Sequence, residues 1–155
     1  MKLASLLTIL VMAFPVFAQT SPEGAGKLQP NEVPRLAIRW DCNGCGDNPK
    51  VPPLIEKAYA EEAARQGVSV SASETADLAI VQYHQRPPAS RAVFGAFAGR
   101  DTLSARVVFR QQPFDAGDYS RNAWFGMNSL CETVGRQAFE KISAALRAQP
   151  PGVSR

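Results

Sequence analysis

The sequence contains few of the side chains on which metal sites and acid–base catalysis usually depend. Its 155 residues include 1 histidine and 3 cysteines. Structural zinc usually takes four nitrogen or sulfur ligands, and His84 lies far along the chain from Cys42 and Cys45. An EF-hand starting at Asp41 also fails, because its twelfth position is Pro52 and not glutamate. We therefore expect no metal site, and no motif predicts a cofactor.

The chain also lacks a block of charge of one sign. Lysine and arginine number 17 against 14 aspartate and glutamate residues, which gives a formal net charge of +3. The arginines are scattered along the sequence, whereas nucleic-acid-binding domains gather basic residues on one face. Nucleic acid is therefore not an expected partner.

The one long apolar run stands at the N-terminus. Lys2 precedes the apolar stretch Leu3–Phe14, and small residues lie near Ala18, so residues 1–18 are predicted to be a secretory signal peptide, cleaved near Ala18-Gln19. The run is short for a membrane span, and no second run of about 18 apolar residues follows. We expect a periplasmic or secreted protein without a transmembrane span after cleavage. No cysteine follows the predicted cleavage point, so the usual lipoprotein anchor is missing.

The remaining chain predicts one small domain between two irregular ends. Residues 19–33 are rich in Ser, Pro, Gly and Gln and lack periodicity, which indicates a flexible leader. Residues 149–155 indicate a disordered tail. Residues 34–148 have the length of a single domain, and no internal repeat is visible.

Apolar periodicity predicts the strands. The four predicted strands are Arg35–Trp40, Val68–Ser71, Ala76–Gln85 and Asp101–Arg110. The last two should pair as an antiparallel hairpin across a connection that contains Pro87, Pro88, Gly95 and Gly99. Residues 73–75 and Gln111–Asp118 are predicted to be turns.

Two helices complete the prediction. The first begins near Pro52 or Pro53 and stops before Gly67, with Glu62 among its water-facing residues. The second covers about Asn122 to Arg147 and carries a long apolar stripe. The element order β-α-β-β-β-α predicts an α+β two-layer sandwich, with a mainly antiparallel sheet and the helices packed on one face.

This element order resembles a broad group of small bacterial envelope proteins. The group includes uncharacterised lipoproteins, activators of penicillin-binding proteins and the periplasmic part of curli-type secretion channels. The likeness covers Leu36 to Leu146 and rests on the segments "RQGVSV", "ADLAIVQYHQ", "R...FGAFAG" and "TLSARVVF". It implies a non-catalytic binding or assembly module of the cell envelope. The missing lipid-anchor cysteine and the Cys42–Cys45 pair are departures from the group.

Cys42 and Cys45 give the sharpest chemical signal. In an exported protein such a pair favours a structural disulfide. A thioredoxin-like site would place the first cysteine at a helix N-terminus, but a loop with several glycine and proline residues intervenes here. A thiol-disulfide redox protein is the alternative function, and a metal site or free thiols are less favoured. Cys131, on the apolar stripe, is predicted to be a buried hydrophobe, with a bridge to Cys42 or Cys45 as the alternative.

The glycine-rich connection Ser90–Gly99 is the candidate contact site. Its small and apolar residues predict an exposed loop that binds another envelope protein, and a strand or hairpin tucked against the sheet is the alternative. The candidate binding residues are Arg91, Phe94, Phe97 and Arg100. No catalytic residue is predicted, because His84 has no placeable nucleophile beside it.

Overall fold

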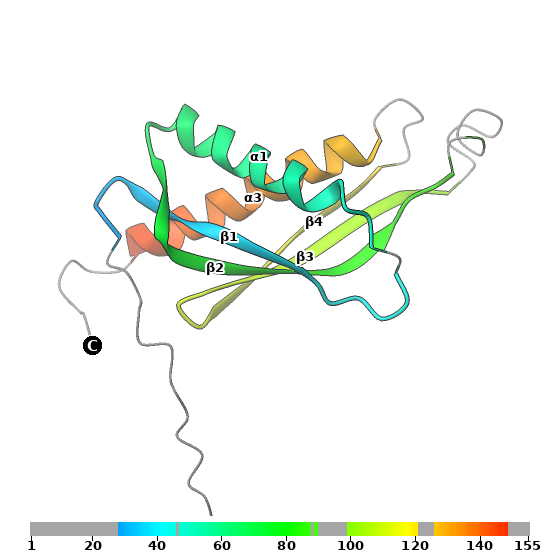
Figure 1. Ribbon diagram of the computed structural model, residues 1–155, viewed down its shortest axis with the longest axis horizontal. Coiled ribbons are helices and arrows are strands. Elements are labelled where there is room, and N and C mark those ends of the chain that lie inside the picture. The colour runs from blue at the N-terminus through cyan, green and yellow to red at the C-terminus, as the bar shows by residue number, and fades with distance from the viewer. Residues whose placement is uncertain (1–27, 46, 88, 90–98, 121–125, 149–155) are drawn as a thin grey trace, which may run out of the picture.

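The computed structural model describes residues 28–45, 47–87, 89, 99–120 and 126–148. The described elements are β1 (Glu32–Trp40), α1 (Val51–Arg65), β2 (Ser69–His84), β3 (Asp101–Phe109), β4 (Gln112–Ser120) and α3 (Met127–Ala148). The strands form one sheet in the order β1-β2-β3-β4. The β1–β2 pair is parallel, and the β2–β3 and β3–β4 pairs are antiparallel. Both helices lie over one face of the sheet (Figure 1), which confirms the predicted α+β fold.

β2 is one long strand where the sequence predicted a short strand, a turn and a second strand. Pairing with β1 begins at Ser69 opposite Glu32 and resumes at Thr75 opposite Arg35 after an irregularity in register. Within that irregularity the backbone N–H of Ser73 donates to Ser71 Oγ. The strand therefore continues through residues 73–75, with a side-chain hydrogen bond at Ser73 and renewed pairing with β1 at Thr75, and the predicted turn there is wrong.

The predicted turn over Gln111–Asp118 is also wrong, because β4 occupies most of it. The real turn consists of Arg110 and Gln111, whose φ angles are 48° and 66°. Two successive positive φ angles are typical of the tight hairpin turn that suits the twist of paired strands. Such turns usually contain Asn or Gly, and neither residue occurs at positions 110 and 111. Arg110 is held there by Glu74, at 3.0 Å from Nε to Oε1.

α1 begins with prolines in its first turn and ends at Arg65, with Gln66 as its C-cap residue, and Gly67 has the positive φ of 69° expected after a helix end. One predicted surface residue of α1 is misplaced. Glu62 is buried, and its carboxylate accepts hydrogen bonds from Arg65 and Gln66. A charged group near the C-terminal end of a helix can be buried when its oxygen atoms are paired in this way.

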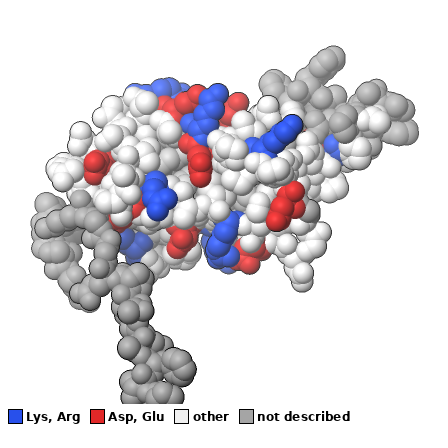
Figure 2. Space-filling model, in the orientation of Figure 1, with Lys and Arg blue, Asp and Glu red and all other residues white. Residues whose placement is uncertain are grey.

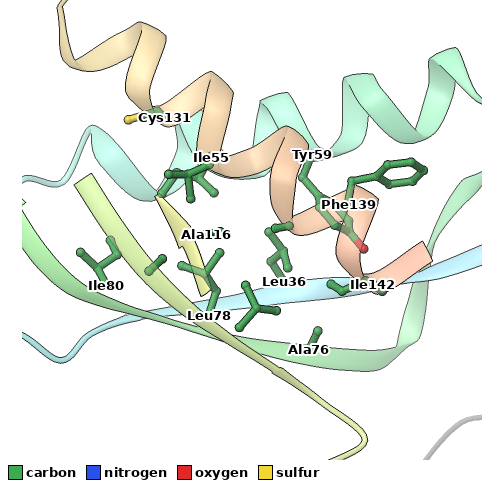
Figure 3. Close-up of a cluster of buried hydrophobic side chains, with 14 of the residues drawn as sticks. Leu36, Ile55, Tyr59, Ala76, Leu78, Ile80, Ala116, Cys131, Phe139 and Ile142 are labelled. Atoms are coloured by element: carbon green, nitrogen blue, oxygen red, sulfur yellow. The ribbon is translucent and has the colours of Figure 1, made fainter. Parts of the chain in front are cut away.

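The core lies between the helices and the covered face of the sheet (Figure 3). Of the stripe predicted on the last helix, only Leu146 is partly buried against the core, and all the others are buried: Met127, Leu130, Cys131, Val134, Ala138, Ile142 and Ala145. Tyr59 of α1 packs edge-on against Phe139 of α3, with ring centroids 5.8 Å apart. Its hydroxyl donates to Pro34 O at 2.8 Å, which fastens α1 to β1.

Candidate functional site

A buried ion pair joins the two ends of the connection between β2 and β3. Arg86 follows the end of β2, and Asp101 begins β3. Their side chains are 1% and 0% exposed, and Arg86 Nη2 lies 3.2 Å from Asp101 Oδ2. The backbone N–H of Arg86 also donates to Asp101 Oδ1 at 2.7 Å. The two ends of the connection are therefore joined through one carboxylate.

The same guanidinium binds two further stretches of backbone. Its Nη1 donates to Gly99 O at 2.9 Å, and its Nη2 donates to Ser120 O at 3.3 Å. Ser120 lies opposite Asp101 where β4 ends. Buried charges are tolerated when their hydrogen-bonding groups are satisfied, as here. We call this set of Arg86, Gly99, Asp101 and Ser120 the Arg86 hub.

An exposed cation–aromatic pair lies beside the hub. The Arg100 guanidinium stands 5.2 Å from the centroid of the Tyr119 ring, and Tyr119 is 54% exposed. Tyr119 and Thr102 are cross-strand partners, and Thr102 pairs in turn with His84. The arrangement presents a cation, an aromatic ring and an imidazole at the end of the sheet where the connection begins.

The structure thus places one of the four predicted binding residues. Arg100 is exposed and belongs to this cation–aromatic pair. Arg91, Phe94 and Phe97 lie outside the described residues. Sequence reasoning missed Arg86, Asp101 and Tyr119, because none of them belongs to a motif or stands out in the apolar pattern.

A second network lies at the same end of β2. A shift in register at Val81 places Tyr83 opposite Leu103, so the ring lies on the helix-covered face and packs edge-on against Trp40 at 5.2 Å. The Tyr83 hydroxyl donates to Gln85 Oε1 at 2.6 Å and accepts a hydrogen bond from Asn48 Nδ2 at 2.9 Å. This network fastens the cysteine-containing loop after β1 to the end of β2.

The cysteines are arranged as a closed loop and a buried thiol. Cys42 and Cys45 form a disulfide, with Cα atoms 5.7 Å apart, and Cys131 is free and buried. Burial raises the pKa of the Cys131 thiol to about 12, so very little reactive thiolate forms at neutral pH. The N-cap residue of α1 is Lys50, five residues after Cys45. Neither cysteine therefore lies in the first turn of α1, the position in which a helix dipole lowers the pKa of redox cysteines.

We predict that Cys42→Ser and Cys45→Ser each lower the free energy of unfolding by about 2 kcal/mol, because the bridge closes a short loop in the unfolded chain. Denaturant unfolding with and without reductant measures the loss. The wild-type protein under reductant is the control and should lose a similar amount. Unchanged stability, with disulfide-exchange activity that both variants lack, would instead identify a redox protein.

Nothing in the described residues indicates catalysis. No group of three or more His, Cys, Asp or Glu side chains there could hold a metal ion. His84 is exposed at the surface, as the sequence suggested.

Among the described helices, none combines the length and apolarity that crossing a membrane requires. Figure 2 shows acidic and basic side chains interspersed on the face in view.

Comparison with known proteins gives no family. No protein-family model matches the chain, and no curated protein matches it. Among solved structures, it is similar to a ribosomal subunit interface protein from Coxiella burnetii, with 11% identity, a TM-score of 0.40, and coverage of 71% of this chain and 97% of the other. It is also similar to the PelC dodecamer from Paraburkholderia phytofirmans, with 9% identity, a TM-score of 0.47, and coverage of 77% and 93%. Both TM-scores lie below 0.5, so neither likeness indicates a role for this chain.

Proposed function

We propose that this protein is a non-catalytic binding or assembly module of the bacterial cell envelope, exported to the periplasm or beyond. Its partner is another envelope protein, which contacts the β2–β3 connection and the surface beside it. The observation that carries this proposal is the Arg86 hub. A buried, multiply bonded ion pair holds both ends of the connection and the end of β4 in one place.

Holding the root of a loop in place favours binding. A contact surface that is already ordered loses less conformational entropy when a partner docks. Arginine and tyrosine are also enriched among the residues that dominate the binding energy of protein interfaces. Arg100 and Tyr119 supply both residue types at the margin of the connection, and they lie against each other. The residues nearest the predicted contact loop therefore have the chemistry of an interface.

Site-specific photo-crosslinking in living cells tests the proposal. A photoreactive phenylalanine analogue at position 119 should form covalent adducts with another envelope protein on irradiation, because this ring is 54% exposed beside the proposed contact surface. Denaturing gels with mass spectrometry then identify the adduct.

The matched control carries the same analogue at Ala60, which is exposed on α1 on the helical side of the molecule. Adducts at position 119 that are absent at position 60 support the proposal. Equal adducts at both positions, or none at position 119, would contradict it.

A further inference from the structure

The two outer edges of the sheet differ in how their backbone donors are used. On β4 the N–H of Gly117 donates to Gln137 Oε1 at 2.9 Å, and strand alternation puts Pro113, Asp115 and Tyr119 on the same outer side. Pro113 has no N–H, and the N–H of Tyr119 donates to Asp118 Oδ1. Only one of the four positions therefore keeps an available donor. This is how proteins usually protect an edge strand.

The outer edge of β1 has no such protection over its second half. The backbone N–H of Asp41 donates to Ile80 O of β2 at 2.8 Å. In a parallel pair the N–H and C=O groups of every second residue face the partner strand, so on β1 the backbone groups of the odd-numbered residues face β2. Leu36, Ile38 and Trp40 then direct their N–H and C=O groups outward. Within the described part of the chain, these outward groups have no hydrogen-bond partner.

The ends of this unprotected stretch are well defined. Pro34 has no N–H, and its carbonyl oxygen already accepts from Tyr59. At the other end, the chain leaves the strand at Asp41 and enters the disulfide-closed loop. Ile38 and Trp40 are partly exposed beside the edge, although they pack against the core. The edge from Leu36 to Trp40 thus offers hydrogen-bonding groups and apolar surface together.

We propose that a second copy of this chain pairs with β1 through this edge, so that two antiparallel β1 strands join the sheets into one of eight strands. Pairing Ile38 with Ile38 of the second copy sets Leu36 opposite Trp40. It makes about six backbone hydrogen bonds, since each copy offers three outward donors and three outward acceptors. The helices of both copies then lie on the same side of the joined sheet.

The charges on β1 select this register. With Ile38 at the centre, Arg35 lies opposite Asp41 of the second copy, twice by symmetry. If the register of the two strands shifts by two residues in one direction, Arg35 of one copy lies opposite Arg39 of the other. If it shifts by two residues in the other direction, the Arg39 side chains of the two copies lie opposite each other. Directly opposed like charges destabilise a strand pair, and opposite charges stabilise it. Arg35, Arg39 and Asp41 are all exposed, and Asp41 already attracts Arg39 of its own chain at 3.0 Å.

Sedimentation velocity on the purified protein, at concentrations up to about 0.1 mM, tests the pairing. The wild type should show a monomer–dimer equilibrium. Arg35→Asp and Asp41→Arg should each raise the dissociation constant about tenfold, because each turns two attractive pairs into two repulsive ones. Mixing the two variants should restore dimers, since the heterodimer regains both opposite-charge pairs.

Arg106→Asp is the matched control. Arg106 lies on the same uncovered face of the sheet but on the inner strand β3. Edge pairing predicts that this variant dimerises like the wild type. A wild type that stays monomeric would overturn the proposal. An Arg106→Asp variant that loses dimers as Arg35→Asp does would also overturn it, because that result would indicate face-to-face packing. A mixture of the Arg35→Asp and Asp41→Arg variants that stays monomeric would overturn it as well. These outcomes are independent of adducts at position 119, which lies on the opposite edge strand.

Discussion

Arg86→Met is expected to lower the free energy of unfolding by about 3–5 kcal/mol, because it removes the guanidinium that is paired with the buried Asp101 carboxylate. Asp101 is 0% exposed, and the substitution removes the guanidinium while keeping the N–H of residue 86 as a donor. The carbonyl oxygens of Gly99 and Ser120 also lose the donor that Arg86 gives them. Thermal and denaturant unfolding of the purified variant measure the loss.

The companion variant Arg86→Met with Asp101→Asn separates charge from packing. It removes both charges, and the Asn side-chain oxygen can still accept the hydrogen bond from residue 86. We expect the double variant to recover more than half of the stability lost in Arg86→Met, since the buried carboxylate charge that lost the Arg86 guanidinium is removed as well. Arg106→Met is the surface control, because its ion pair with Asp115 is exposed and should contribute less than about 1 kcal/mol. A loss in Arg86→Met no larger than in Arg106→Met would contradict the account of the hub.

Gly135→Leu is expected to lower the free energy of unfolding by about 3 kcal/mol, because the two helices are in contact at this glycine. A Cβ atom at position 135 would stand 2.6 Å from Ile55 O and 2.8 Å from Ala58 Cβ. The first of these neighbours is backbone, so α1 would have to move away from α3. Denaturant unfolding measures the change.

Ala144→Leu on the exposed side of the same helix is the matched control. It should change the free energy of unfolding by no more than about 0.5 kcal/mol, as surface substitutions usually do. Gly135→Ala sharpens the test, because alanine stabilises an ordinary helix interior by about 1 kcal/mol relative to glycine. A more stable Gly135→Ala protein would show that the helices do not pack as closely as described.

The order and type of most elements could be predicted because their apolar periodicity matches their burial. In β3, Leu103, Ala105, Val107 and Phe109 alternate along the strand, and all four are buried. The apolar stripe of α3 was predicted in the same way, and so was that of α1 apart from the buried Glu62. Periodicity is a local property of the chain, and here the tertiary structure agrees with it.

The prediction failed where tertiary contacts override local preference. β4 carries proline, glycine and three acidic or amide side chains, but it is held by pairing along its whole length with β3. The turn before it uses Arg110 and Gln111 in conformations that usually favour glycine or asparagine. No local rule predicts a strand or a hairpin from such residues.

Only part of the candidate site could be predicted from the sequence, for a related reason. The glycine-rich connection stands out in the sequence, and with it Arg100. Arg86, Asp101 and Tyr119 are 15 to 33 residues apart pairwise within the chain and meet only through strand register. Their roles depend on burial and on neighbours that a single sequence does not reveal.

Whether the Arg86 hub prepares this surface for a partner can be measured as the yield of adducts from the photoreactive residue at position 119 in two backgrounds, wild type and Arg86→Met with Asp101→Asn. We predict that the hub variant stays folded at the growth temperature but gives a clearly lower yield, because the root of the contact surface is no longer held by the ion pair. An equal yield in both backgrounds, with both proteins folded, would show that the hub does not prepare this surface for a partner.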